Sequence, residues 1–251
     1  FTVMCMGKQV VVNKVRDIPR NRTQTILKSS GGRYERKFII PYDCAKEVET
    51  VVKLHPNHFK EIFYQRRVNN IYYDTRDMKF YHDNVDGATN RIKARIRWYG
   101  EMLSKDQVNA KLEFKVRNGF VGYKDTIHMD KFSFGYGISC QRIDDYTSTS
   151  LHDGYHFTKA LYPALLNTYK RKYYESCDGK FRFTIDEDMQ YYNMGSLNNV
   201  ISVPSHKDRR IVLELKYDKG YDDIVKSITE HIPYRLSKNS KYVNGIECTK
   251  D

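Results

Sequence analysis

Residues 91–100 read RIKARIRWYG, and a basic residue stands at every second position between apolar ones. The basic residues are Arg91, Lys93, Arg95 and Arg97. Side chains alternate between the two faces of a β-strand, so this segment predicts a strand with one apolar and one cationic face. Neighbouring cations on that face are about 7 Å apart and repel one another. The face therefore either is solvated, so that water screens the charges, or lies along an anionic partner.

The same alternation occurs in four further segments, residues 33–37, 111–117, 180–186 and 210–216. The polar faces of the five segments carry thirteen cations and four carboxylates, whereas the whole chain has 43 Lys and Arg residues and 31 Asp and Glu residues. The simplest interpretation is a solvated face of an antiparallel sheet. Such faces usually mix both signs, because like charges on directly opposite residues destabilise a sheet. The excess of cations thus favours the alternative, in which the charged faces surround an anionic ligand.

Two amphipathic segments, residues 41–55 and 222–232, predict helices that can cover the apolar faces of these strands. The charged faces then point inward if the sheet closes into a barrel. We therefore predict an α+β fold whose antiparallel barrel encloses a wide, wet lumen, since each unpaired charge in a dry one would cost several kcal/mol. Residues 31–251 are expected to form this single domain. Residues 1–30 are basic and aperiodic, and we expect a poorly ordered extension there.

The net charge of +12 indicates a polyanionic partner, such as nucleic acid, an anionic membrane or a phosphorylated small molecule. Nucleic acid is disfavoured because the chain has a single Trp residue and no recognised RNA- or DNA-binding motif. The five Cys residues are far apart and form no CxxC pair, which argues against a disulfide framework or a zinc site and for a reducing compartment. No apolar run approaches the roughly 20 residues that a membrane helix needs, so we expect a cytoplasmic protein.

Eight short motifs follow one another between about Arg33 and Glu247. In order they read RYERKF, IYYDT, RIKARIRWYG, LEFK, YKRKYY, FRFTID, VLELK and SKNSKY. Their order resembles that of the VTC domain, the catalytic domain of the vacuolar transporter chaperone polyphosphate polymerases, and of its bacterial relatives. This family belongs to the triphosphate tunnel metalloenzymes, so the resemblance implies a closed, eight-stranded antiparallel β-barrel with a basic interior and helices packed outside. That fold agrees with the alternation in the strands.

The resemblance also implies roles for individual residues. Seven cations correspond to the family's phosphate-handling residues, namely Lys37, Arg95, Arg97, Lys115, Arg171, Arg182 and Lys241. Further contacts to the phosphate chain are expected from Arg33, Lys93, Lys216, Lys238 and Ser240. Glu214 corresponds to the family's metal-binding glutamate, and we expect Glu113 and Glu35 to assist it. Carboxylate oxygens suit the expected cofactor, Mn²⁺ or Mg²⁺.

The first motif departs from the pattern of the wider superfamily. Hydrolytic and cyclase members carry Glu-x-Glu-x-Lys in this strand, whereas this chain has Arg33 in place of the first glutamate. Hydrolysis benefits from several carboxylates that hold metals and orient the attacking water. The replacement therefore favours transfer of a phosphate group to phosphate over transfer to water.

These observations together predict a metal-dependent polyphosphate polymerase that transfers the γ-phosphate of ATP to a growing polyphosphate chain. Its partners would be ATP and inorganic polyphosphate or pyrophosphate. The resemblance also leaves open a partner subunit that is a membrane protein, and we expect no part of it to be encoded in this chain. Such a subunit would place the domain at the cytoplasmic face of a membrane. Two other functions stay open: a triphosphatase, nucleoside triphosphate hydrolase or cyclase on the same fold, and a non-catalytic polyphosphate-binding domain.

Overall fold

The computed structural model describes residues 33–119, 121–135, 161–194 and 206–249, so the predicted extension over residues 1–30 lies outside the described part. The strands are β1 (Arg33–Pro41), β2 (Lys60–Asp74), β3 (Asn90–Tyr99), β4 (Ser104–Asn118), β5 (Val121–Phe134), β6 (Tyr162–Glu175), β7 (Phe181–Asn193), β8 (His206–Asp208) and β9 (Arg210–Asp218). The helices are α2 (Ala45–Lys53), α3 (Lys79–Val85), α5 (Val225–Thr229) and α6 (Lys241–Cys248), with the 3-10 turns η2 (Tyr42–Cys44) and η4 (Lys219–Tyr221). The fold is thus α+β and dominated by its strands.

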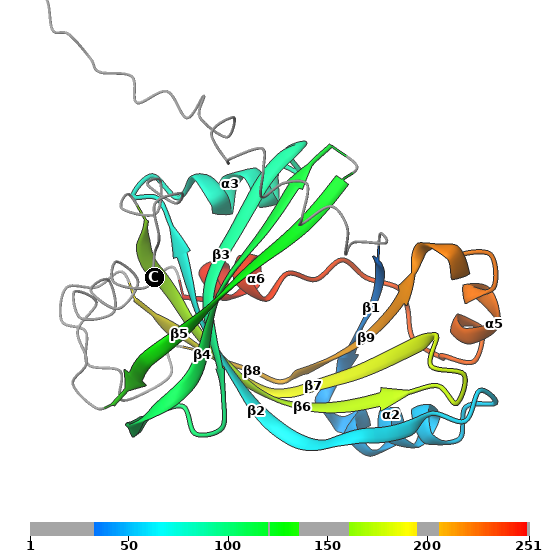
Figure 1. The fold of residues 1–251 in the computed structure, drawn as a ribbon. Helices are drawn as coiled ribbons and strands as arrows, with labels where there is room; N and C mark the ends of the chain where they lie inside the picture. Colours follow the sequence, from blue (N-terminus) through cyan, green and yellow to red (C-terminus); the bar gives the residue numbers. More distant parts are fainter. Residues whose placement is uncertain (1–32, 120, 136–160, 195–205, 250–251) are drawn as a thin grey trace, which may run out of the picture.

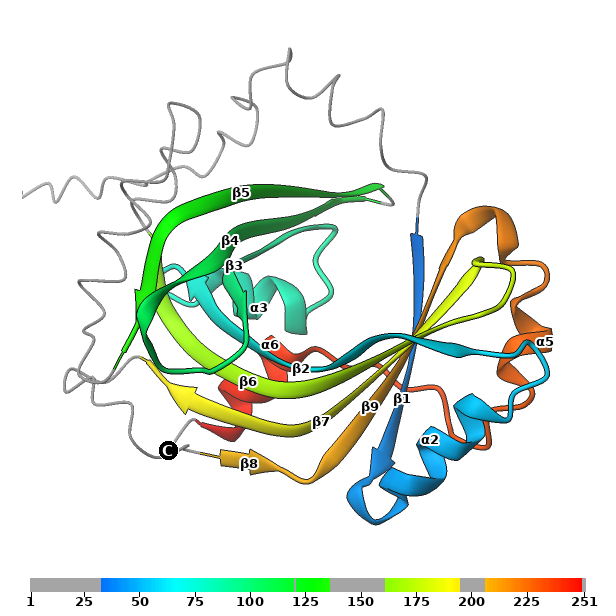
Figure 2. The same cartoon turned by 60° about the horizontal axis from the view of Figure 1, so that its bottom comes forward.

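All described strands belong to one antiparallel sheet of nine strands with the order β1-β9-β7-β6-β2-β3-β4-β5, and β8 pairs with β7 beside this path. The sheet curves strongly around a central space (Figure 1, Figure 2). The prediction of a closed barrel is wrong, because β1 and β5 are the two unpaired ends of this strand order, and the sheet has nine strands in place of the predicted eight. Alternation within a strand fixes which face is charged, but it carries no information on whether the outermost strands pair. A side-chain ion pair connects β1 with β4, the neighbour of β5, since Lys115 Nζ on β4 lies 3.2 Å from Glu35 Oε1 on β1.

The alternation predicted for residues 91–100 is confirmed in β3. Ala94, Ile96 and Trp98 are 1%, 0% and 0% exposed on the apolar face of the strand. They belong to a buried cluster that includes Leu112 of β4 and Phe132 of β5. Lys93, Arg95 and Arg97 occupy the opposite face, on the concave side of the sheet. One strand thus contributes both to the core and to the wall of the central space.

Helices α2 and α5 cover the side of the sheet that faces away from the central space (Figure 1). Val48 and Val52 of α2 and Val225 and Ile228 of α5 lie in one buried cluster with strand residues such as Leu213. Both predicted helices are therefore present, although α5 is shorter than the predicted segment 222–232. Because the helices cover the apolar face, the polar face of these strands is left for the concave side. Within the described residues, no helix combines the length and the apolar character that crossing a bilayer requires.

Helix α6 lies on the concave side of the sheet, and its first residues reach the central space (Figure 2). Ser240 caps the helix, because its Oγ accepts a hydrogen bond from the Val243 N–H at 3.4 Å. Asp74, the last residue of β2, accepts a hydrogen bond from the Tyr242 hydroxyl and another from the backbone N–H of Tyr81 in α3, at 2.8 Å. This one carboxylate therefore fixes β2, α3 and α6 relative to one another.

Candidate active site

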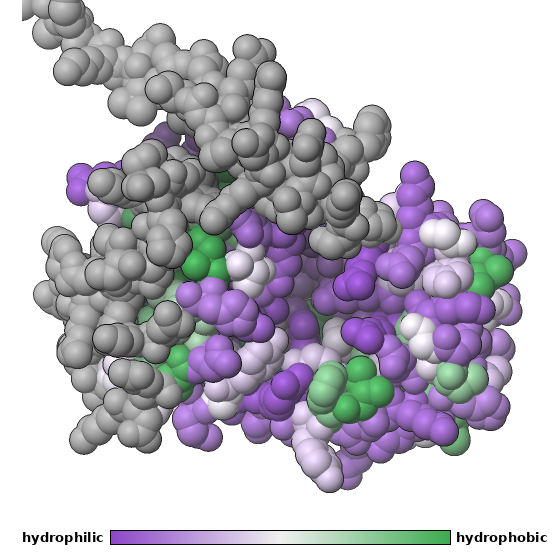
Figure 3. All heavy atoms as spheres, in the orientation of Figure 1, coloured by the Kyte–Doolittle hydropathy of each residue, from purple (hydrophilic) through white to green (hydrophobic). Residues whose placement is uncertain are grey.

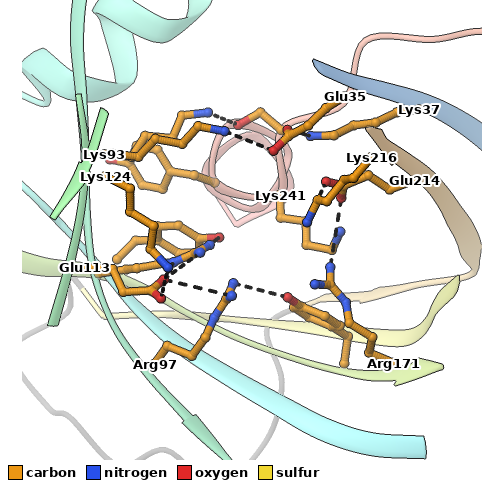
Figure 4. A pocket seen from close by; sticks show the side chains of 16 residues that line it. Glu35, Lys37, Lys93, Arg97, Glu113, Lys124, Arg171, Glu214, Lys216 and Lys241 are labelled. Carbon is orange, nitrogen blue, oxygen red and sulfur yellow. Dashed lines mark hydrogen bonds and ion pairs between the residues drawn. The ribbon is translucent and has the colours of Figure 1, made fainter. Parts of the chain in front are cut away.

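The concave side of the sheet forms a cavity of about 140 Å³ (Figure 4). Hydrophilic residues surround a hollow on the face of the molecule shown in Figure 3. The lining residues are Glu35 and Lys37 (β1), Tyr72 (β2), Lys93, Arg95 and Arg97 (β3), Glu113 and Lys115 (β4), Lys124 (β5), Tyr169 and Arg171 (β6), Glu214 and Lys216 (β9), and Ser240, Lys241 and Tyr242 at the start of α6. Nine of these side chains are basic and three are carboxylates, so the cavity suits a polyanion.

Glu113 holds three cations on one wall of the cavity. Its Oε2 lies 2.7 Å from Arg95 Nη2 and 3.9 Å from Arg97 Nη1. Its Oε1 lies 2.5 Å from Lys124 Nζ. Burial by itself raises the pKa of a carboxyl group, but the charges of these three cations outweigh burial and lower the pKa of Glu113 to about 2. Glu113 is therefore ionised and paired with these cations, and it fixes the orientation of the two arginines.

Asp186 of β7 holds two cations on the far wall and is itself fully buried, with 0% exposure. Its Oδ1 lies 2.5 Å from Arg171 Nε, and its Oδ2 lies 2.6 Å from Lys241 Nζ. Both cations also lie against the ring of Tyr169, with Arg171 Cζ at 5.2 Å and Lys241 Nζ at 4.9 Å from its centroid. Burial raises the pKa of Asp186, but the charges of Arg171 and Lys241 bring it below its ordinary value. An ionised carboxylate and an aromatic ring thus position two cations that face the cavity.

Two further carboxylates converge from the adjacent strands β1 and β9. Glu35 stands opposite Lys216 and Lys37 stands opposite Glu214, so the two glutamates are diagonal neighbours on one face. Glu214 Oε1 lies 3.1 Å from Lys216 Nζ, and Glu35 Oε2 lies 3.7 Å from Lys37 Nζ. Burial raises the pKa of both carboxyl groups and mutual repulsion adds to this at Glu35, but the surrounding lysines lower both below their ordinary values. Both glutamates are therefore ionised.

Residues 32–250 match a family model described as the VTC domain. The chain belongs to the VTC domain family. The match includes every described residue and confirms the resemblance drawn from the eight motifs. A comparison with curated proteins gives no significant match.

Three solved structures with a similar fold are distant from this VTC domain in sequence. A candidate adenylate cyclase from Vibrio parahaemolyticus is 10% identical with a TM-score of 0.49, and the similarity covers 85% of this chain and 98% of that one. A candidate adenylyl cyclase from Hippeastrum, whose dominant activity is that of a triphosphatase, is 12% identical with a TM-score of 0.48 and coverage of 84% and 93%. The capping-enzyme triphosphatase of mimivirus is 11% identical with a TM-score of 0.36 and coverage of 84% and 94%.

The structure brings most of the residues predicted from the sequence into the cavity of this VTC domain. Those that line it are Glu35, Lys37, Lys93, Arg95, Arg97, Glu113, Lys115, Arg171, Glu214, Lys216, Ser240 and Lys241. Three predicted residues lie outside the lining. Arg33 pairs with Asp218 at 3.2 Å, and Arg182 pairs with Glu175 at 2.6 Å. Lys238 is exposed. Arg33 and Arg182 stand at or next to the first residue of their strands, where the polar face continues past the cavity.

Five residues of the site are absent from the sequence-based prediction. They are Asp186 and the lining residues Tyr72, Lys124, Tyr169 and Tyr242. Lys124 stands directly opposite Lys115, which stands opposite Lys93, so three lysines form a row across β5, β4 and β3. Such a row is visible only once the register of the strands is known. Like charges in this arrangement destabilise a sheet, which agrees with a wall that binds an anion.

The described residues contain no cluster of three or more His, Cys, Asp or Glu side chains that could hold a metal ion by themselves. Mg²⁺ in phosphoryl-transfer sites is usually bound by one or two carboxylates together with the phosphates of the substrate. Glu35 and Glu214 provide such a pair from adjacent strands. Their arrangement therefore fits a divalent metal that binds together with phosphate. Each of these glutamates contacts two cations, whereas Glu113 contacts three.

Proposed function

We propose that this VTC domain is a metal-dependent polyphosphate polymerase, which transfers the γ-phosphate of ATP to the end of a polyphosphate chain held in the cavity. The observation that carries the proposal is that nine basic side chains and only three carboxylates line one cavity on the concave side of the sheet. Charges removed from water are costly unless they are paired, so an anionic chain in this cavity would be strongly favoured. Family membership supports a polymerase, because the resemblance of the motifs implies polyphosphate synthesis.

Phosphoryl transfer needs positioning and charge stabilisation more than covalent help from the protein. In the proposed reaction, an oxygen of the terminal phosphate attacks the γ-phosphorus of ATP, and the bond to the β,γ-bridging oxygen breaks, so that ADP leaves with that oxygen. The attacking oxygen is already anionic, so no general base is required. Arg95 and Arg171 are suited to stabilise the transferring group, because Glu113 and Asp186 hold their guanidinium groups in fixed orientations.

Glu214 and Glu35 would hold Mn²⁺ or Mg²⁺ together with phosphate oxygens. The metal would supply charge neutralisation on the transferring phosphate. Lys216 and Lys37 pair with these glutamates at 3.1 Å and 3.7 Å, so they would lie beside the same phosphates. In this proposal Glu113 orients the arginines and does not bind the metal. The expected metal ligands are therefore Glu35 and Glu214 alone.

The test is incubation of the purified chain with ATP and Mn²⁺ or Mg²⁺, followed by gel electrophoresis of phosphate chains and analysis of the nucleotides. We expect polyphosphate that lengthens with time, together with ADP. Orthophosphate without chains would instead assign a hydrolase, and a cyclic nucleotide would assign a cyclase. ATP that binds but yields no product would assign a non-catalytic binding domain.

Lys93 gives this site a pH dependence. Its Nζ donates a hydrogen bond to Ser240 Oγ at 2.9 Å. Burial, followed by the charges of neighbours such as Lys37 and Lys115, lowers the pKa of Lys93 to about 7. A bound polyanion favours the protonated amine, so the affinity for inorganic triphosphate should fall as the pH rises above 7, by up to about tenfold per pH unit. Calorimetric titrations between about pH 6 and pH 9 measure this change.

The matched variant is Lys93→Met, which keeps a long side chain but removes the titrating amine. Its affinity for triphosphate should vary less with pH than that of the wild type. Triphosphate itself ionises in this range, but equally for both proteins, so the difference between them reports on Lys93. Identical pH profiles would show that Lys93 does not titrate with binding.

A further inference from the structure

A group of aromatic rings surrounds the guanidinium of Arg66 beyond one end of the cavity. Arg66 Cζ lies 4.7 Å from the ring centroid of Phe63, 4.8 Å from that of Tyr99 and 4.7 Å from that of Tyr173. We call these four residues the aromatic cluster. The pairing of β2 with β6 shifts between Phe63 and Arg66, as it does just before Phe63. In a regular strand these two residues would point to opposite faces, and the shift brings both into one cluster.

The aromatic cluster continues the lining of the cavity along the same face of the sheet. Arg66 stands directly opposite Arg171 in the pairing of β2 with β6. Tyr173 follows Arg171 by two residues on β6, and Tyr99 follows Arg97 by two residues on β3, so each shares a face with a lining residue. Arg171 Cζ lies 5.9 Å from the ring centroid of Tyr173. The cluster therefore lies beside arginines that line the cavity.

Two features indicate that the cluster is built to receive a ligand. Phe63 and Tyr99 are 51% and 39% exposed, so much of each ring is open to solvent. Arg66 Nε and the Tyr173 hydroxyl are buried, and neither makes a hydrogen bond within the described part of the chain. Unsatisfied buried polar atoms are costly. A ligand with an aromatic face would cover the exposed rings, and polar atoms along its edge would become partners of these two atoms once the Arg66 and Tyr173 side chains turn toward it.

We infer that the aromatic cluster binds the base of a nucleoside triphosphate whose phosphates occupy the cavity. Bases stack on tyrosine and phenylalanine rings and on the arginine guanidinium, and this stacking tolerates different bases. The cluster and the cavity share one face of the sheet, so a single molecule can contact both. The inference rests on the proposed function, because the base reaches the cluster only if the cavity accepts the triphosphate.

Calorimetric titrations with ATP and with inorganic triphosphate, both without metal, separate the contribution of the base from that of the phosphates. The double variant Phe63→Leu and Tyr99→Leu keeps apolar bulk but removes both exposed rings. We expect it to bind ATP about 10- to 100-fold more weakly than the wild type and triphosphate within a factor of about two. The control is Tyr64→Leu, since Tyr64 adjoins Phe63 but is 91% exposed and outside the cluster. It should bind both ligands as the wild type does.

Unchanged ATP affinity in the double variant would overturn the inference, and so would an equal loss of affinity for both ligands. Retained binding of triphosphate also shows that the double variant is folded. If the wild-type chain binds neither ligand, both the proposed function and the base site are contradicted. If the wild type and the double variant bind both ligands with the same affinities, only the base site is contradicted.

Discussion

A Glu214→Gln variant is expected to lose turnover by about 10²- to 10³-fold while it still binds ATP. Glutamine has nearly the same shape but no charge, so it holds a divalent metal poorly. The change also removes the counter-charge that lies 3.1 Å from Lys216 Nζ, so metal-free ATP binding should be equal or tighter. Rates of ADP formation with Mn²⁺ or Mg²⁺ and calorimetry without metal measure the two effects separately.

Glu175→Gln is the matched control, because Glu175 pairs with Arg182 at 2.6 Å outside the cavity lining. This variant should keep the turnover of the wild type. Wild-type turnover in Glu214→Gln would contradict the metal-binding role of Glu214. Loss of ATP binding together with turnover would show that Glu214 is needed for the shape of the cavity instead.

Asp186→Asn is expected to cause the largest loss of stability, about 3 to 5 kcal/mol in the free energy of unfolding. Asparagine keeps the size of the side chain but leaves Arg171 and Lys241 without their shared counter-charge, which lies 2.5 Å and 2.6 Å away in the wild type. Urea unfolding at neutral pH measures the difference. Because both cations line the cavity, the variant should also bind triphosphate more weakly than the wild type when it is folded.

The pH dependence of this effect follows from the pKa of Asp186, which lies below its ordinary value of 3.8 in the folded chain. The contribution of the carboxylate to stability is fully present above about pH 3.8 and is lost as the pH falls through the folded-state pKa. The stability difference between wild type and variant should therefore be constant near neutral pH and shrink only in acid. The control is Asp218→Asn, whose carboxylate makes an exposed ion pair with Arg33 at 3.2 Å and should contribute less than about 1 kcal/mol. Equal losses in the two variants would contradict the anchoring role of Asp186.

Local patterns in the sequence predict much of the site. The alternation in β3 predicts that Arg95 and Arg97 share a face and that Trp98 is buried, and the structure shows both. A period of two is a property of the single strand, so it needs no knowledge of the partners. The family motifs add Glu214 and Lys241, which line the same cavity from β9 and from the start of α6.

Features that depend on pairing between distant segments are not predicted in this way. Asp186 lies on β7, but its two cations come from β6 and α6, so its anchoring role exists only in the folded chain. The gap between β1 and β5 depends on the curvature of the whole sheet. This curvature cannot be inferred from the sequence of any single strand. The irregular pairing between Phe63 and Arg66 likewise reverses the face expected for one of them.

Calorimetric titration of inorganic triphosphate, without metal, tests most directly whether the inward-facing cations form one site for a phosphate chain. We predict one bound triphosphate per chain and an affinity at least about tenfold weaker in Lys115→Gln, because a hydrogen bond to a charged group contributes about 1.5 to 3 kcal/mol. Lys115 lines the cavity, whereas Lys46 lies on α2 and is not part of the lining, so Lys46→Gln should bind as the wild type does. Absence of saturable binding by the wild type would contradict a single site for the phosphate chain. An equal loss of affinity in the two variants would contradict it as well.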